Sequence, residues 1–62
     1  MEAQFYTQAH QMYLEGTSYE KPTDDEVLIE ALNHKYGAFN IDIFYDSMQN
    51  FWRYYADISI ID

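Results

Sequence analysis

The residues able to support catalysis or metal binding are few and scattered along the chain. The sequence contains no cysteine, and its two histidines, His10 and His34, lie far apart. A histidine beside a carboxylate can act as a general acid or base, or hold a zinc ion. His34 falls in the last turn of a predicted helix, where the helix dipole favours a cation, and His10 borders an apolar helix face. We therefore expect no enzyme activity, no metal site and no cofactor.

One acidic run, Asp24-Asp25-Glu26, has the composition of a cation site. It lacks the spaced ligands and the central glycine of a calcium-binding loop. Thr23 and Glu26 have the spacing of a capping box, in which each side chain accepts a hydrogen bond from the backbone N–H of the other residue. The acidic run is therefore predicted to begin a helix rather than to bind a metal.

The charge balance limits the classes of molecule that the protein can bind. The 62 residues include 11 Asp and Glu against 3 Lys and Arg, which gives a formal net charge of −8. Direct binding of nucleic acid requires a basic surface, so it is not expected. No apolar run is long enough to span a membrane, and the first residues do not resemble a signal peptide. We expect one cytoplasmic domain over residues 1–62 that acts by binding another protein.

Hydrophobic periodicity predicts an all-α protein, a compact three-helix domain. The predicted helices cover residues 2–15, 23–36 and 41–56, and Gly16 and Gly37 are the expected ends of the first two. The helix over 23–36 has a wide apolar arc, so we expect neighbours to cover it on two sides. In the third helix the apolar positions recur with the helical period, at Phe44, Met48, Phe51, Trp52 and Tyr55.

Alternation of apolar and polar residues leaves an α+β alternative open. Phe39, Ile41 and Ile43 are separated by polar residues, and Ile58 and Ile60 alternate with Asp57 and Ser59. This period of two is typical of a half-buried strand. In the alternative, two short strands near 38–44 and 57–62 pair with each other.

Acidic side chains opposite the predicted apolar arcs are candidates for partner binding. Glu26 and Glu30 share the polar side of the second helix, while Asp42, Asp46 and Asp57 share that of the third, with Arg53. Tyrosine is enriched at interfaces, and two tyrosines fall outside the arcs, one on the third helix and one in a loop. The predicted partner-binding residues are Glu26, Glu30, Asp42, Asp46, Tyr54 and Tyr19.

In size and charge the chain resembles the small acidic inhibitors that bacteriophages and mobile elements encode. These include DNA mimics, anti-restriction proteins and anti-CRISPR proteins. The resemblance implies an inhibitor in the cytoplasm of a bacterial host cell, which blocks the basic nucleic-acid-binding cleft of a host protein. The carboxylates of Glu26, Glu30, Asp42 and Asp46 would then occupy the positions of DNA phosphates.

A second interpretation places the binding site on the aromatic residues. The chain carries 7 Tyr, 4 Phe and 1 Trp, which so short a domain is not expected to bury within itself. The protein would then be a helical homo-oligomer or an antitoxin-like adaptor, self-associating through Tyr54, Trp52 and residues 58–61. Its acidic residues would serve solubility alone. Salt separates the two interpretations, because only charge-driven binding weakens steeply as ionic strength rises.

The capping box predicts that Thr23 contributes to stability. Thr23→Ala should lower the free energy of unfolding by on the order of 1 kcal/mol, because it removes the acceptor for an orphan helix N–H. Thermal melts of the wild type and the variant measure the loss. Superimposable melts would show that no helix begins at Thr23.

Overall fold

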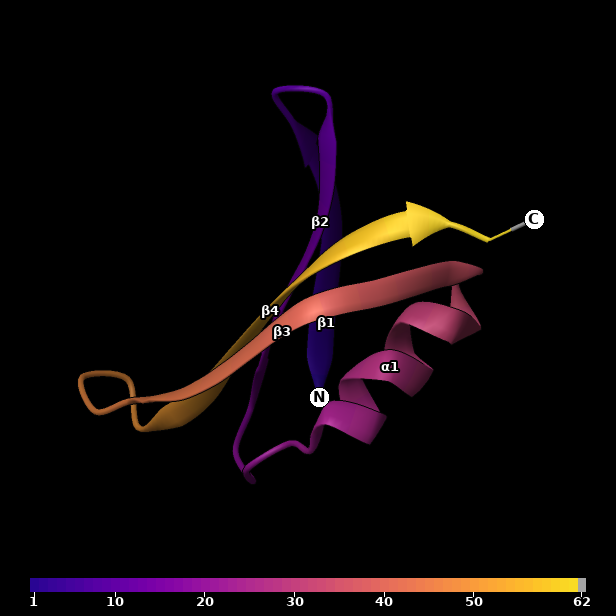
Figure 1. The fold of residues 1–62 in the computed structure, drawn as a ribbon. Coiled ribbons are helices and arrows are strands. Elements are labelled where there is room, and N and C mark those ends of the chain that lie inside the picture. The colour runs from indigo at the N-terminus through magenta and orange to yellow at the C-terminus, as the bar shows by residue number, and fades with distance from the viewer. Residues whose placement is uncertain (62) are drawn as a thin grey trace.

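The computed structural model describes residues 1–61 and consists of one antiparallel sheet and one helix (Figure 1). Two hairpins flank the helix in the sequence, and β4 pairs with β2, so that the strand order is β1-β2-β4-β3. The helix lies against one face of the strongly twisted sheet. The elements are β1 (Glu2–Gln8), β2 (Gln11–Ser18), α1 (Asp24–Asn33), β3 (Tyr36–Asp46) and β4 (Phe51–Ile60).

The all-α prediction is wrong in two of its three helices. Residues 2–15 form the β1–β2 hairpin, and residues 41–56 span most of the β3–β4 hairpin. The first hairpin turns at Ala9 and His10, both with positive φ (51° and 66°), as two-residue hairpin turns require. Neither residue is the Asn or Gly typical of that turn. Without a recognisable turn between them, the two short strands were predicted as one continuous helix.

The α+β alternative is also wrong, because it predicts too few strands and makes them too short. Residues 38–44 lie in β3 and residues 57–60 in β4, but both strands are longer than expected and a second hairpin precedes the helix. Residue 62 lies outside the described residues. The expected alternation also changes phase, because a bulge between Phe39 and Asp42 leaves Asn40 with a φ of 53°. Phe39 consequently faces away from the side on which Ile41 and Ile43 lie.

The predicted start of the central helix is confirmed. Thr23 Oγ1 accepts a hydrogen bond from the Glu26 N–H, and the Thr23 N–H donates to Glu26 Oε1, both at 3.1 Å. The helix ends earlier than expected, at Asn33, and Lys35 rather than Gly37 adopts the left-handed conformation (φ 66°).

The helix is covered on one side only, which corrects the expectation of two covered sides. Its buried residues are Val27 and Ala31. Ile29 and Leu32 are 56% and 53% exposed. Because the sheet covers α1 from one side, Ile29 and Leu32 of the apolar arc face solvent.

The core lies between α1 and the sheet. Strand alternation directs every second residue of β2 and β4 toward the helix, and small residues there lie beside large ones across the strands. Gly16 pairs with Tyr54, and Leu14 pairs with Ala56. The buried core consists of Leu14, Val27, Ala31, Tyr54, Ala56 and Ile58.

Tyr54 occupies the space that a side chain at position 16 would fill. A Cβ added to Gly16 would overlap the phenol ring of Tyr54 and the carbonyl oxygen of Glu2. The Tyr54 hydroxyl donates to that same Glu2 oxygen at 3.3 Å, so one side chain crosses β2 and connects β4 to β1. Tyr54 is fully buried. Burial, together with the charge of Glu30, raises the pKa of Tyr54 to about 12.

The overlap predicts that the two glycines differ in their tolerance of a methyl group. Gly16→Ala should destabilise the fold by more than about 2 kcal/mol, because backbone and a packed ring both lie in the way. Gly37→Ala is the matched control, since its added Cβ would lie 3.4 Å from Ile61 Cγ1. That variant should stay within about 1 kcal/mol of the wild type. Urea unfolding compares them, and equal stabilities would refute the packing of Tyr54 over Gly16.

The raised pKa of Tyr54 predicts a loss of stability in alkali. Above pH 10 the unfolded chain loses the phenol proton, whereas the folded chain keeps it until the pH approaches 12. The folded state binds more protons in this interval, so stability falls as pH rises, by on the order of 2 kcal/mol. Tyr54→Phe has no such proton. The difference in unfolding free energy between wild type and Tyr54→Phe should therefore shrink across the interval, and a constant difference would contradict the assignment.

Candidate functional site

The sheet face that points away from α1, called here the open face, carries polar and aromatic side chains from all four strands. No helix among residues 1–61 covers it. Because all pairings are antiparallel, and the register shifts only at the β3 bulge between Phe39 and Asp42, its side chains align in rows across the four strands. Three complete rows, each read from β1 through β2 and β4 to β3, are Glu2–Thr17–Arg53–Phe44, Gln4–Glu15–Tyr55–Asp42 and Tyr6–Tyr13–Asp57–Phe39.

Aromatic side chains stack in pairs on the open face. The rings of Tyr6 and Tyr13 lie 5.4 Å apart between β1 and β2, and those of Phe44 and Tyr55 lie 5.7 Å apart between β3 and β4. Phe39, at 46% exposed, extends the aromatic surface along β3. Cross-strand pairs of this kind stabilise the sheet, and here they also leave apolar rings in contact with solvent.

Acidic side chains surround these rings. The open face carries one basic residue, Arg53, whose Nε lies 2.8 Å from Asp46 Oδ2. Asp46 also accepts the backbone N–H groups of Met48 and Gln49 in the β3–β4 turn. The Arg53 hydrogen bond, followed by these turn contacts, holds the pKa of Asp46 below its ordinary value. The carboxylates of the face are Glu2, Glu15, Asp42, Asp46 and Asp57.

Three of these carboxylates have no protein partner. Asp57 Oδ2 accepts a hydrogen bond of 2.9 Å from Asn40, and Asp46 is paired with Arg53. Within residues 1–61, the side chains of Glu2, Glu15 and Asp42 make no hydrogen bond or ion pair. Their negative charge is therefore available to another molecule.

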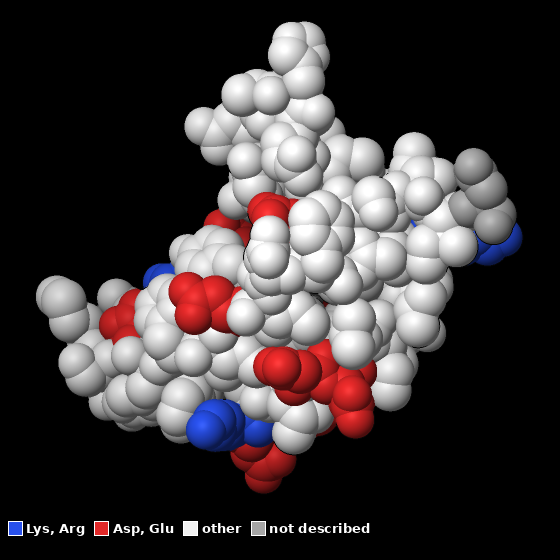
Figure 2. All heavy atoms as spheres, in the orientation of Figure 1, with Lys and Arg blue, Asp and Glu red and all other residues white. Residues whose placement is uncertain are grey.

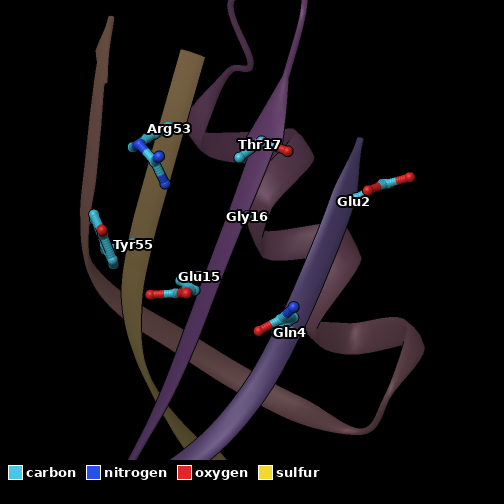
Figure 3. A pocket seen from close by; sticks show the side chains of 7 residues that line it. All are labelled: Glu2, Gln4, Glu15, Gly16, Thr17, Arg53 and Tyr55. Carbon is cyan, nitrogen blue, oxygen red and sulfur yellow. The ribbon is translucent and has the colours of Figure 1, made fainter. Parts of the chain in front are cut away.

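A shallow hollow is lined by two of the free carboxylate residues, Glu2 and Glu15, but not by Asp42 (Figure 3). Residues of β1, β2 and β4 line it; the Glu15 side chain points toward Tyr55, whereas the Glu2 side chain points away from the other labelled residues. Partial burial raises the pKa of the neighbouring Tyr6, and the charge of Glu15 adds to the effect. Carboxylates beside an aromatic ring suit a lysine or arginine side chain. The lining consists of Glu2, Gln4, Glu15, Gly16, Thr17, Arg53 and Tyr55.

Nucleophilic catalysis and metal binding on the open face would each require a particular group of side chains. The face has no cysteine and no serine beside a histidine on its strands. Within residues 1–61 there is no group of three or more His, Asp or Glu side chains suited to holding a metal ion. What the face offers is stacked rings and uncompensated negative charge.

The four acidic residues predicted to bind a partner do not share one surface. Asp42 and Asp46 lie on the open face, whereas Glu26 and Glu30 lie on α1, on the other side of the sheet. Glu26 is held by the capping box and Asp46 by Arg53. Figure 2 likewise shows the acidic residues as groups separated by uncharged surface. A single cleft cannot contact all four at once.

The two predicted tyrosines have different environments. Tyr54 is fully buried against α1, so it is a core residue and is inaccessible to a partner. Tyr19 is 87% exposed in the connection between β2 and α1. Of the residues expected to make the self-association contact, Ile58 is also buried in the core, whereas Trp52 is half-buried and Ile60 and Ile61 are exposed.

Sequence reasoning missed half of the open face. Glu2, Glu15, Tyr6 and Tyr13 lie within residues 2–15, the segment predicted as a helix, and none of them was predicted to bind a partner. The available signal was alternation: Glu2, Gln4, Tyr6 and Gln8 occupy every second position of β1. The grouping of Asp42, Asp46, Asp57 and Arg53 on one side was right, although a strand hairpin rather than a helix places them there.

Comparisons of the chain with protein-family models, curated proteins and solved structures found no match. The single helix of residues 1–61, α1, is too short to cross a bilayer. The open face is therefore the feature from which a function must be argued.

Proposed function

We propose that this protein is a small acidic binding domain whose open face docks on a basic surface of another protein. The observation that supports the proposal is the composition of that face. It combines stacked aromatic pairs with five carboxylates and a single arginine, which is itself paired. Aromatic rings supply buried area at an interface, while uncompensated carboxylates steer a basic partner toward it.

A protein partner fits this face better than a nucleic acid does. Open sheets with exposed aromatic rings are also used to stack the bases of single strands, but those sheets carry Lys and Arg for the phosphates. Here the chain has a net charge of −8, and the guanidinium of Arg53 is engaged by Asp46. Phosphates would be repelled from the open face, whereas a groove lined with Lys and Arg would be attracted.

The finer form of the proposal is inhibition by DNA mimicry. The protein would act without catalysis in the cytoplasm of a bacterial host cell, and would block the nucleic-acid-binding cleft of a host protein. Glu2, Glu15 and Asp42 would contact the basic residues of the cleft. They replace the four predicted acidic residues, which lie partly on α1 and partly on β3. The small size and strong negative charge of the chain support this form.

The stacked ring pairs favour a second candidate that uses the same face. In it the protein is an adaptor whose affinity comes from Tyr6, Tyr13, Phe44 and Tyr55, and the carboxylates serve only solubility. Charge-driven docking weakens as salt rises, whereas ring-driven docking does not. One pair of variants separates the two candidates.

Charge reversal on the open face should slow the capture of basic partners. The double variant Glu15→Lys/Asp42→Lys changes one row by four charge units, whereas Glu20→Lys/Asp25→Lys makes the same change away from the open face, in the β2–α1 connection and on α1. Immobilised wild type and both variants would be exposed to the heparin-binding fraction of a bacterial lysate across a salt series. Association of the recovered partner with the open-face variant should slow by about tenfold or more at low salt, because long-range charge sets the on-rate.

The control variant should capture the same proteins as the wild type. Equal capture by both variants, with circular dichroism showing both folded, would contradict docking through charges of the open face and leave the ring-driven adaptor. For mimicry, the recovered partner must also lose its DNA binding when the protein is added. Simultaneous binding of DNA and protein would refute mimicry while leaving docking intact.

A further inference from the structure

We propose that two copies of this chain pair through β1, edge to edge and antiparallel, to form one continuous sheet. The proposal concerns the edge of the sheet and does not depend on what the open face binds. The two outer strands of the sheet are β1 and β3. An unpaired outer strand presents backbone N–H and C=O groups that a further strand can bond, and natural sheets usually protect such edges.

The outer strand β3 is protected, whereas β1 is not. The bulge between Phe39 and Asp42 breaks the regular edge of β3. β1 pairs with β2 at all seven positions without a register shift. Its sequence, EAQFYTQ, contains no proline, lysine or arginine, the residues with which edges are commonly protected. A regular edge without these residues can accept another strand.

The hairpin turn determines which backbone groups of β1 point outward. In a two-residue hairpin the residues that flank the turn form a hydrogen-bonded pair, here Gln8 and Gln11, and such pairs then alternate along the strands. Ala3, Phe5 and Thr7 therefore direct their N–H and C=O groups away from β2. In residues 1–61, none of the backbone hydrogen bonds outside the helix and the strand ladders involves β1.

One register makes β1 complementary to itself. Centred on Phe5, it places Phe5 opposite Phe5 of the second copy and Ala3 opposite Thr7. All of these residues have outward-pointing backbone groups, so they form hydrogen-bonded pairs. The same register places Glu2, the sole charged residue of β1, opposite Gln8. No carboxylate faces another across the new strand pair, in spite of the net charge of −8.

Phe5 adds apolar contact to this pairing. It lies on the helix side of β1, with its ring 4.5 Å from that of His34 and 5.4 Å from that of Tyr36, and it is half-buried. Its remaining exposed surface meets the same ring of the second copy. Residues that pair across two strands direct their side chains to the same side of the sheet. The open faces of the two copies would therefore lie on the same side of the joined sheet and form one surface.

Sedimentation equilibrium should show a dimer that depends on the outward N–H of Thr7. Thr7 is exposed, and proline is tolerated on an edge strand where its missing N–H faces solvent. Thr7→Pro should be folded by circular dichroism and should dissociate at least tenfold more readily than the wild type, whereas Thr7→Ser, which keeps the N–H, should dimerise normally. A monomeric wild type at hundreds of micromolar, or a dimer unchanged in Thr7→Pro, would overturn the proposal.

Disulfide trapping tests the register without relying on the proline variant. The chain has no cysteine, so single introduced thiols report on one position each. Gln4→Cys mixed with Tyr6→Cys should oxidise to a mixed dimer, because these positions lie directly opposite in the proposed register. Gln4→Cys mixed with Gln8→Cys is the out-of-register control. Trapping of the control pair at an equal or higher yield would refute β1 pairing in this register. The Glu15→Lys/Asp42→Lys variant should remain dimeric, which separates this proposal from the function of the open face.

Discussion

The fold depends on the packing of Tyr54 across Gly16. The tyrosine ring fills the position of the missing side chain, and its hydroxyl reaches the Glu2 carbonyl on β1. An aromatic ring over a strand glycine is a recognised way to fix strand register. Here it fixes three strands at once, because β4, β2 and β1 all contribute to the contact. The alignment of Glu2, Thr17 and Arg53, in the adjoining row of the open face, follows from the same register.

Local capping was predictable from the sequence, whereas strand pairing was not. Thr23 and Glu26 are three residues apart, and their mutual hydrogen bonds need no tertiary partner. The β1–β2 turn at Ala9 and His10 takes positive φ values without the residues that usually signal such a turn. The bulge at Asn40 also reverses the alternation of β3. The turn and the bulge are determined by packing between residues far apart in the sequence. The helical period of Phe44, Met48 and Phe51, which is a local pattern, was therefore misleading.

Only part of the candidate site could be placed from the sequence. The acidic and tyrosine-rich composition led to the prediction of a binding surface, and Asp42, one of the residues predicted for it, lies on the open face without a protein partner among residues 1–61. Glu2 and Glu15 were missed because they belong to strands that the sequence did not reveal. Tyr54 was misplaced because a residue off a helical arc becomes a core residue when the element is a strand. The resulting picture is a domain with one buried face, formed around Tyr54, and one exposed face that bears the rings and free carboxylates.

Cross-saturation in nuclear magnetic resonance tests this picture most directly, because apolar side chains are exposed on both sides of the sheet, and two groups of them can be compared. One is the set of open-face rings, and the other is the outer side of α1, where Ile29 and Leu32 are exposed. In a complex with a captured basic partner, irradiation of the partner should reduce the signals of Tyr6, Phe44 and Tyr55. The methyl signals of Ile29 and Leu32 should keep their intensity. Loss of the Ile29 and Leu32 signals with unchanged open-face rings would contradict the account.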